Sequence, residues 1–300
     1  MKWVKTPAEV HAVVAELRCE GKRVGLVPTM GALHEGHLSL VRLARSRADL
    51  VVVSVFVNPK QFGPGEDYTR YPREIDRDSE VLASNGCDVL FAPSVECMYS
   101  VSDRTRIHVT DLSEPLCGES RPGHFDGVAL VVAKLFNIVR PDVAVFGQKD
   151  AQQAVIIQRM TADLDYPIRI VIGPTVREPD GLAMSSRNSF LSGDERKRAM
   201  ALFGALGEAR RMITSGERDA VKIRAAMHRV MTEAGIDVEY ADVVEGATMK
   251  PKDRIEGTLL LAVAGRLGGT RLIDNMALRI DGDEIGEVVL EFPEWSMYDS

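Results

Sequence analysis

The sequence predicts an α/β fold in which a doubly wound parallel sheet is followed by a second, smaller α+β domain. The run LVVVSVFV at Leu50–Val57 is almost wholly apolar and rich in β-branched residues, as is typical of strands covered on both faces. Strand-like and helix-like segments alternate five times before Gly173. The pattern then changes at Gly173–Gly193, where three glycines and little periodicity indicate a linker or an active-site loop.

The first helix has clear boundary signals. Thr6 can act as N-cap, Pro7 takes the first helical position and Glu9 stands at N3, so a helix is expected over Thr6–Leu17. Apolar runs and apolar residues at helical spacing predict the elements that follow. In chain order these are a strand at Arg23–Val27, a helix at His37–Ala48, the strand at Leu50–Val57, a helix at Glu74–Asn85, a strand at Asp88–Ala92, a helix at Asp126–Val139, a strand at Val143–Phe146, a helix at Asp150–Leu164 and a strand at Ile168–Ile172.

The C-terminal part predicts the smaller domain. Asp194–Ala234 is rich in Ala, Arg, Met and Glu at helical spacing, which predicts two helices. Three strands are expected after it, at Val238–Val244, Thr258–Ala264 and Thr270–Asn275. The tail from Asp281 is acidic, and its last residues are expected to be flexible. We therefore divide the chain into a Rossmann-like domain over residues 1–175 and an α+β domain over residues 176–300 that closes over the active site.

Composition restricts the class of protein. The 300 residues are enough for two domains, and 45% apolar with 27% charged residues is ordinary for a globular chain. A net charge of -7 disfavours nucleic acid as the main partner, because proteins that bind a phosphate backbone are usually basic. No apolar run is long enough to span a membrane, and charged residues interrupt the N-terminal segment, so neither a membrane anchor nor a signal peptide is expected.

The cysteines predict a reducing compartment. They form no C-x-x-C pair and are scattered among unrelated segments, at Cys19, Cys87, Cys97 and Cys117. Such scattered residues are expected to be reduced thiols, which favours a cytoplasmic protein.

The stretch PTMGALHEGH, from Pro28 to His37, stands between a predicted strand and a predicted helix. A helix N-terminus exposes unpaired N–H groups and the positive end of the helix dipole, so it binds anions well. Gly31 and Gly36 would leave room for a ligand close to the backbone. His34 and His37 would lie on one side of a helical turn and could donate hydrogen bonds to phosphate oxygens.

Other interpretations of this stretch compete with a phosphate site. The zinc-protease motif H-E-x-x-H requires histidines four residues apart, and these are three apart. A different metal site would need a third ligand, and no Cys/His cluster supplies one. A plain turn with two surface histidines remains an alternative, because the four-residue motif alone is only moderately specific.

H-x-G-H in this position resembles the signature of the nucleotidyltransferase superfamily, which includes class I aminoacyl-tRNA synthetases. Those proteins pair it with a later phosphate-binding motif of Lys/Ser type, and AMSSRN at Ala183–Asn188 fits that role. Two hydroxyls and a guanidinium supply donors for a triphosphate, and arginine can bind two oxygens at once. Alone, this segment could simply be a helix cap.

Longer strings narrow the resemblance to the pantothenate synthetase (pantoate–β-alanine ligase) family. They occur in order at Pro28–His37, Phe56–Phe62, Tyr71–Arg73, Arg121–Phe125, Gly147–Gln153, Pro174–Asn188 and Thr270–Asn275. The resemblance implies condensation of (R)-pantoate with β-alanine to pantothenate, with ATP giving AMP and pyrophosphate through a pantoyl-adenylate intermediate. It also implies Mg²⁺ with ATP, a homodimer, and a first domain that binds both nucleotide and pantoate.

The resemblance further implies roles for individual residues. The expected catalytic residues are His34, His37, Lys149 and Arg187, with His37 as the family's assigned proton donor. The expected ATP-binding residues are Met30, Gly31, His34, His37, Gly147, Lys149, Asp150, Val176, Met184, Ser185, Ser186 and Arg187. The amides of Gln61 and Gln153 are expected to hold pantoate, since a buried amide can donate to a carboxylate and accept from a hydroxyl. Gln61 is also expected near β-alanine.

Some positions are less firmly assigned. Asp76 and Asp78 are the candidate ligands of Mg²⁺. Gln148 departs from several relatives, which carry an acid between the glycine and the lysine, and an amide is tolerated if only backbone atoms are used there. A flexible lid is expected at Cys117–Arg121. Lesser site candidates are Asn58, Tyr71, Arg121 and His124.

Two other functions stay open. A nucleotidyltransferase that leaves the nucleotide on its product would share H-x-G-H but not the strings VNPKQF and QKDAQQ. A regulatory module that only binds nucleotide would not need Lys149, Arg187 and both glutamines together. A tRNA-binding synthetase is disfavoured, because the chain is acidic and has no basic anticodon-type domain.

Overall fold

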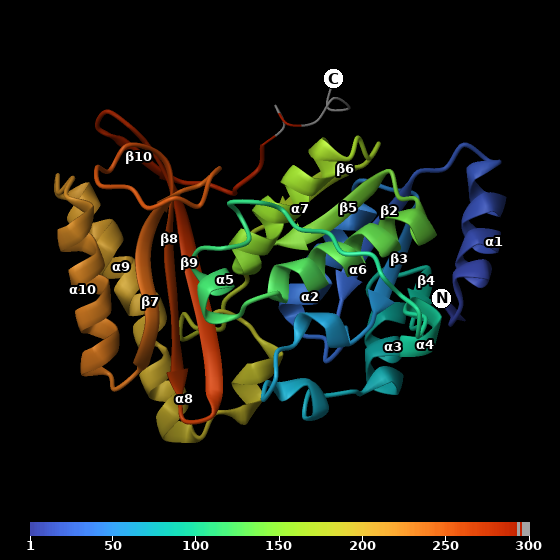
Figure 1. Cartoon of the computed structure of the whole chain (residues 1–300), viewed down its shortest axis with the longest axis horizontal. Coiled ribbons are helices and arrows are strands. Elements are labelled where there is room, and N and C mark those ends of the chain that lie inside the picture. Colours follow the sequence, from blue (N-terminus) through green and yellow to red (C-terminus); the bar gives the residue numbers. More distant parts are fainter. Residues whose placement is uncertain (293–294, 296–300) are drawn as a thin grey trace.

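A computed structural model describes residues 1–292 and 295 and contains two sheets (Figure 1). The six-stranded sheet is parallel in all its pairings and has the order β1-β4-β3-β2-β5-β6. Its strands are β1 (Lys2–Val4), β2 (Val24–Thr29), β3 (Leu50–Val55), β4 (Val89–Phe91), β5 (Val143–Gly147) and β6 (Arg169–Gly173). The flexibility expected of the last residues concerns positions 293, 294 and 296–300, which lie outside the described residues.

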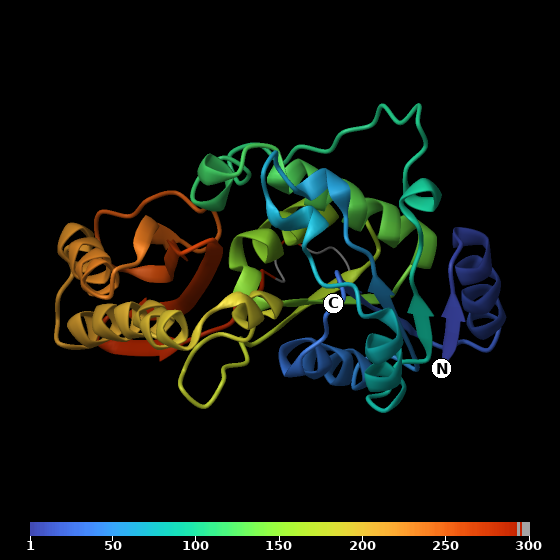
Figure 2. The ribbon, with the colours of Figure 1, turned by 90° about the horizontal axis from the view of Figure 1, so that it is seen from below.

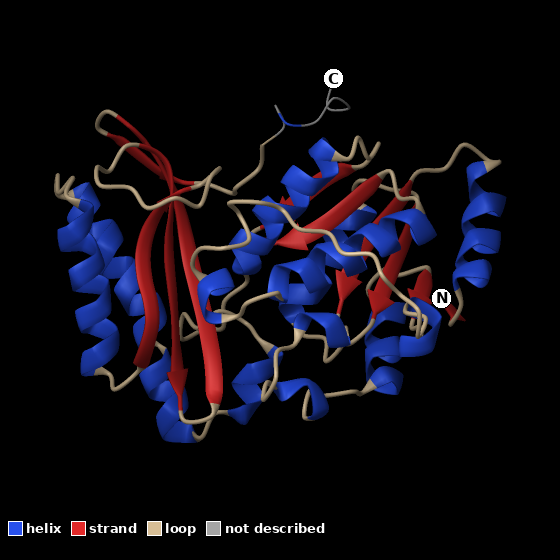
Figure 3. Cartoon of the chain, viewed as in Figure 1, coloured by secondary structure: helices blue, strands red, loops and turns tan. Residues whose placement is uncertain are grey.

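Helices cover both faces of the parallel sheet, which confirms the doubly wound architecture (Figures 2 and 3). One face packs against α1 (Pro7–Arg18), α6 (His124–Val139) and α7 (Ala151–Asp163), and the other against α2 (Glu35–Arg45) and α3 (Ile75–Ala83). Successive residues of β2 follow this division, since Leu26 packs with the first group of helices and Val27 with the second. Shorter helices are α4 (Val95–Met98) and α5 (Cys117–Ser120).

A separate antiparallel sheet at the C-terminus has the order β10-β9-β8-β7. Its strands are β7 (Asp237–Glu245), β8 (Gly257–Leu267), β9 (Thr270–Asp281) and β10 (Glu284–Glu287), and its helices are α8 (Gly193–Ala199), α9 (Ala201–Thr214) and α10 (Ala220–Glu233). Leu259 and Leu261 of β8 pack with α9 and α10, whereas Leu260 and Ala262 join the core of the parallel-sheet domain. The sheet is therefore apolar on both faces, as strands covered from two sides are.

The structure corrects some of the expected elements. The capping box at Thr6 and Glu9 is present and the first helix is confirmed. Asp194–Ala234 forms three helices and not two, because the chain breaks between α8 and α9 at Met200, which serves as C-cap of one and N-cap of the next. The short strands β1 and β10 add an edge to each sheet and are not expected from the sequence pattern.

The strand order defines where a ligand can bind. From β2 the chain proceeds through β3 to β4 on one side, and β5 then pairs on the other side of β2. Doubly wound sheets bind ligands beyond the carboxyl ends of the strands at such a reversal. The loop after β2 and the turn after β5 flank this point. Within the described part of the chain, no helix has the length and apolar character needed to cross a membrane.

The contact between α6 and the 3₁₀ turn Pro59–Gln61 gives a first prediction. A Cβ on Gly127 would lie 2.2 Å from the carbonyl oxygen of Lys60 and 2.6 Å from the backbone nitrogen of Gln61. Gly127→Ala should therefore lower the free energy of unfolding by about 1–3 kcal/mol, measured by urea denaturation, because two backbones must separate. Gly207→Ala is the matched control on the exposed face of α9, where a Cβ meets nothing within 4 Å.

The control substitution should raise the free energy of unfolding by about 0.5–1 kcal/mol, since alanine loses less backbone entropy than glycine in a helix. Equal effects of the two substitutions would show that α6 does not depend on this close approach.

Candidate functional site

The loop after β2 carries the first group of predicted site residues. Gly31 and Ala32 have left-handed backbone, with φ of 85° and 51°, so the chain turns sharply between β2 and α2. The carboxylate of Asp78 on α3 fixes this turn by accepting from the backbone N–H groups of Ala32 at 2.9 Å and Leu33 at 2.8 Å. A Cβ on Gly31 would lie 2.9 Å from Asp78 Oδ2. Glycine is thus required by the packing of the loop itself.

Gly36 has a similar structural role in the first turn of α2. A Cβ there would lie 3.0 Å from two atoms of the His34 ring, so glycine lets this ring lie against the start of the helix. His34 is the N-cap of α2 and His37 stands at N3, because the helix begins at Glu35 and not at His37 as expected. Both histidines therefore belong to the helix N-terminus.

The two imidazoles form a close, neutral pair. Their ring centroids are 4.1 Å apart with planes tilted by 40°. His37 Nδ1 accepts from the backbone N–H of His34 at 3.4 Å, so the proton of its neutral ring is assigned to Nε2. Burial, with a further contribution from the Lys149 charge, lowers the pKa of His34 to about 4 and that of His37 to about 3. Neutral rings at pH 7 donate hydrogen bonds without carrying charge.

The second group follows β5. The chain leaves the strand at Gly147 and passes through the 3₁₀ turn Gln148–Asp150 before α7. Lys149 Nζ lies 3.9 Å from Asp150 Oδ2, and both residues line a cavity between the two domains. A lysine at a helix start works against the helix dipole, so its position favours a role toward a negatively charged ligand.

The third group lies in the loop after β6. The carbonyl of Val176 accepts from the backbone N–H of Met184 at 3.0 Å, which closes this loop as a hairpin. A Cβ on Gly36 would lie 3.7 Å from the Cβ of Met184. The loops after β2 and β6 are therefore in contact, although they are far apart in the sequence.

The hairpin ends in the serines and arginine of the second motif. Ser185 caps the 3₁₀ turn that follows, and its Oγ accepts from the backbone N–H of Arg187 at 3.3 Å. Ser186 Oγ lies 3.1 Å from the hydroxyl of Tyr71, which places the YPR motif beside this turn.

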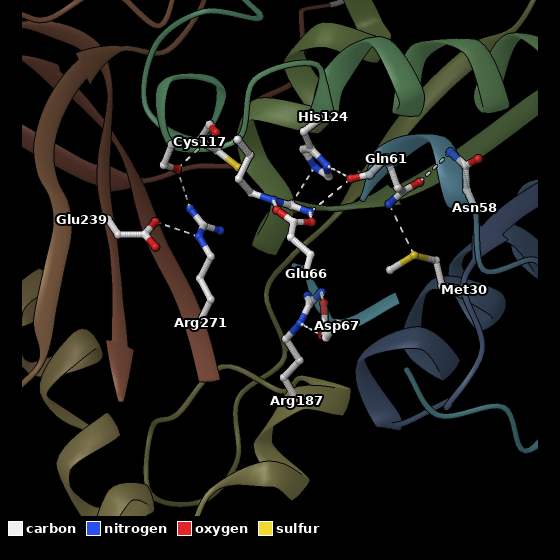
Figure 4. A network of polar contacts seen from close by, with 12 residues as sticks. Met30, Asn58, Gln61, Glu66, Asp67, Cys117, His124, Arg187, Glu239 and Arg271 are labelled. Carbon is white, nitrogen blue, oxygen red and sulfur yellow. Dashed lines mark hydrogen bonds and ion pairs between the residues drawn. The ribbon is translucent and has the colours of Figure 1, made fainter. Parts of the chain in front are cut away.

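Two arginines are paired with adjacent acids in the 3₁₀ segment around Asp67. Arg187 binds both oxygens of Asp67 at 2.7 and 3.0 Å, and Arg121 binds both oxygens of Glu66 at 2.7 and 2.5 Å (Figure 4). Burial alone would raise the pKa of each acid, but the arginine partner outweighs it and lowers the pKa. Neither acid stands out in the sequence, where the only signal is an acidic pair between basic motifs.

Gln61 ends the 3₁₀ turn Pro59–Gln61 and is held in a fixed orientation beside the N-terminus of α6 (Figure 4). Its Oε1 accepts from Asn58 Nδ2 at 3.0 Å, and its Nε2 lies 3.3 Å from Met30 Sδ. Its carbonyl oxygen contacts His124 Nδ1 at 2.8 Å and accepts from Arg121 at 3.2 Å. A weak sulfur acceptor is a poor partner for an amide N–H, so Nε2 remains available to a better acceptor.

The adjacent glutamines of α7 both line the cavity between the two domains. Gln152 is buried, donates to the carbonyls of Leu112 at 3.0 Å and Pro115 at 2.7 Å, and accepts from the backbone N–H of Cys117 at 3.2 Å. It thereby anchors the start of the segment expected to be a lid. Gln153 lines the same cavity beside it.

The cavity has a volume of about 440 Å³ and is lined from both domains. Its lining includes the predicted site residues Lys149, Asp150, Gln153, Ser185 and Arg187. The other predicted ligand-binding residues are outside its lining, namely Met30, Gly31, His34, His37, Gln61, Gly147, Val176, Met184 and Ser186. His34 and His37 lie close to the cavity, because the charge of the lining residue Lys149 lowers the pKa of both rings.

Asp76 and Asp78 do not converge on a metal position. Asp76 is exposed on α3, whereas both oxygens of the buried Asp78 accept from the loop backbone. Side chains two apart on a helix do not face each other. Among the residues that the structure describes, no group of three or more His, Cys, Asp or Glu side chains could hold a metal ion.

The chain resembles characterised proteins over almost all of its length. Residues 2–277 match the family model of pantoate-beta-alanine ligase. It is 52% identical to the pantothenate synthetase of Moorella thermoacetica over 284 residues, which cover 94% of this chain and 100% of that protein. It is 50% identical to the pantothenate synthetase of Thermotoga neapolitana over 279 residues, covering 93% and 100%.

Solved structures agree with this similarity. The crystal structure of pantothenate synthetase from Thermus thermophilus has a TM-score of 0.87 and 45% identity, covering 92% of this chain and 98% of that one. The pantoate-beta-alanine ligase of Francisella tularensis, solved with β,γ-ATP and β-alanine, has a TM-score of 0.78 and 33% identity, covering 92% and 97%. The fold, the ordered motifs and these similarities show that the chain belongs to the pantoate–β-alanine ligase family.

Proposed function

We propose that this protein joins (R)-pantoate to β-alanine, with ATP converted to AMP and pyrophosphate. The observation that supports this most directly is the meeting of three loops at one edge of the parallel sheet. The loop after β2 brings two neutral imidazoles, the turn after β5 brings Lys149, and the loop after β6 brings two serines and Arg187. Together they supply hydrogen-bond donors and positive charge for a triphosphate.

The reaction proceeds in two steps, because a free carboxylate is a poor acyl donor. In the first step an oxygen of the pantoate carboxylate attacks the α-phosphorus of ATP and pyrophosphate leaves, which gives pantoyl adenylate. In the second the amine of β-alanine attacks the acyl carbon, loses a proton and expels AMP. The cavity between the domains supports this sequence, since a reactive acyl adenylate needs shielding from water.

Positive charge at the site serves the first step. Lys149 stabilises the negative charge that develops on the phosphate oxygens. Arg187 binds the triphosphate and must exchange the Asp67 carboxylate for phosphate oxygens to do so. His34 and His37 contribute neutral N–H donors to the same oxygens. His37 is suited to act as proton donor only after the charge of a bound triphosphate has raised its pKa.

The remaining predicted residues position the substrates. The amides of Gln61 and Gln153 bind pantoate, and Gln61 also borders β-alanine. The nucleotide is framed by Met30, Gly31, Gly147, Asp150, Val176, Met184, Ser185 and Ser186, with a ribose hydroxyl donating to Asp150. Mg²⁺ bound to the phosphates of ATP would neutralise part of their charge, and no residue of this chain is assigned as its ligand. No step is assigned to Asp76 or Asp78, because the carboxylate of Asp78 is engaged with the loop backbone.

We also place the domain boundary between residues 175 and 176, just after β6, with the C-terminal domain closing over the site. The protein is proposed to be a cytoplasmic homodimer, as the family resemblance implies. Its four cysteines are free thiols in the structure, which fits a reducing compartment. Light scattering during gel filtration would measure the mass and would contradict the dimer if it gave the mass of one chain.

Pantoate-dependent exchange of labelled pyrophosphate into ATP, measured without β-alanine, tests the first step. The wild type should exchange, because adenylate formation is reversible. His37→Ala should reduce the exchange rate by about 100-fold, since one hydrogen-bond donor to the reacting phosphate is lost. His11→Ala, on the exposed face of α1, is the matched control and should exchange like the wild type.

Two results would contradict this proposal. ATP binding without exchange in the wild type, even after β-alanine is added, would favour a nucleotide-binding module. A dinucleotide product in place of AMP would favour a nucleotidyltransferase.

The neutral histidines predict a specific pH dependence of stability. The folded-state pKa values of about 4 and about 3 lie below the ordinary value of 6.5, so the unfolded chain binds more protons as pH falls below 6.5. The free energy of unfolding should therefore decrease as pH falls from about 7 to about 5. The double variant His34→Gln and His37→Gln should show a shallower decrease in urea unfolding, whereas His11→Gln should follow the wild type. An unchanged slope in the double variant would mean that these rings carry protons in the folded state.

A further inference from the structure

Asn275 of β9 lies in the C-terminal domain but contacts the turn that carries Lys149. It is 6% exposed, and its Nδ2 donates to the carbonyl oxygens of Gln148 at 3.0 Å and Lys149 at 2.8 Å. One side-chain amide thus occupies both of its N–H groups with consecutive carbonyls of the turn. This pair of hydrogen bonds to the backbone fixes the direction in which the turn presents its side chains.

The side chain of Gln148 strengthens the same connection. Its Nε2 lies 3.5 Å from Asn275 Oδ1, and its Oε1 accepts from the backbone N–H of Leu290 at 3.1 Å. The Gln148 amide is therefore buried and used between the domains. The C-terminal domain therefore holds the turn through the backbone carbonyls of Gln148 and Lys149 and through the Gln148 side chain.

Asn275 itself is fixed by a buried ion pair. Arg177 binds both oxygens of Asp274 at 2.6 and 3.0 Å and donates to the carbonyl of Asn275 at 3.3 Å. Asp274 Oδ1 also accepts from the backbone N–H of Asn275 at 2.8 Å. The Arg177 guanidinium lies over the Phe203 ring, 4.2 Å from its centroid. Because Arg177 starts the hairpin that ends at Ser185, this group also joins the second phosphate-binding loop to β9.

We propose that Asn275 is a positioning residue that sets where the Lys149 ammonium lies during adenylate formation. The inference rests on the proposed function, in which Lys149 stabilises charge on the reacting phosphate. Lysine has a long, flexible stem, so the location of its charge depends on a fixed backbone. A displacement of about 1 Å at a catalytic group can cost about 100-fold in rate. Closure of the C-terminal domain would thereby also place the catalytic lysine.

A double-mutant cycle in the pyrophosphate exchange assay tests this inference. Asn275→Ala should reduce the exchange rate at saturating ATP by about 10–100-fold. Lys149→Ala should reduce it further, and Asn275→Ala should then have little additional effect in the Lys149→Ala background. This loss of additivity is expected only if Asn275 acts through Lys149. High enzyme concentration keeps exchange by the slow variants measurable.

Two controls separate positioning from general stability. Thr161→Ala removes another buried donor, 5% exposed, which donates to the carbonyl of Ile157 at 2.7 Å and is bonded neither to the turn nor to its partners Asn275 and Leu290. It should lower the midpoint of thermal unfolding without changing the exchange rate at saturating ATP. Asn275→Ser retains one hydroxyl donor, and it should recover part of the rate if Asn275→Ala folds poorly.

The outcomes are distinguishable. Absence of exchange in the wild type would overturn the proposed function, whatever Asn275 does. If the wild type exchanges but Asn275→Ala costs the same factor in rate in the wild-type and Lys149→Ala backgrounds, only the positioning role is overturned. An unchanged exchange rate in a folded Asn275→Ala protein would also overturn only that role. A rise in the KM for ATP with unchanged kcat would also overturn it, because the substitution would then affect ground-state binding.

Discussion

The site depends on the parallel pairing of β2 with β5 in the six-stranded sheet. This pairing, with Gly25 opposite Val143 and Leu26 opposite Ala144, makes both strands end at the same edge. It therefore brings the histidine loop beside the lysine turn, although they are separated by more than a hundred residues in the sequence. β6 pairs with β5 along its whole length and adds the serine and arginine loop. Polar groups that no local segment could assemble are thus gathered by strand register.

Electrostatic arrangement gives the site a neutral resting state. The imidazoles are kept uncharged by burial and by a nearby lysine, while two arginines are neutralised by Glu66 and Asp67. Charges that are partly buried without partners are costly, and the ion pairs with Glu66 and Asp67 offset that cost. A polyanionic ligand would then compete with Asp67 for Arg187. Under the proposed function, binding of the triphosphate would therefore be coupled to a rearrangement of the segment around Asp67.

Local patterns were sufficient for much of the fold. The β-branched strands, the Thr6 capping box and the H-x-G-H loop all follow from neighbouring residues, and the structure contains them where the sequence predicts. The short strand β1 has one buried residue in three, which gives no periodic signal. The break at Met200 also lacks glycine or proline, so a continuous helical pattern conceals it.

Long-range partners explain what could not be predicted at the site. Sequence alone did not show that Gln152 holds a neighbouring segment, because its bonds to Leu112 and Pro115 form only when α7 is packed. Asp78 was a metal candidate, and its bonds to the loop after β2 depend on α3 lying next to that loop. The glycines of the loop were expected to admit a ligand. A Cβ at Gly31 would meet Asp78 and one at Gly36 would crowd the His34 ring, so packing within the loop itself favours glycine at both positions.

The contacts of Gln148 also bear on synthesis by the ribosome. The turn that carries Lys149 is completed by Asn275 and Leu290, which are 127 and 142 residues farther along the chain. Domains of a nascent chain generally fold from the N-terminus as they emerge. The parallel-sheet domain can therefore form while the turn that carries Lys149 still lacks these partners. Full assembly of the turn has to wait until Asn275 and Leu290 have been synthesised, so a shorter polypeptide has the loop after β2 without a fixed Lys149 turn beside it.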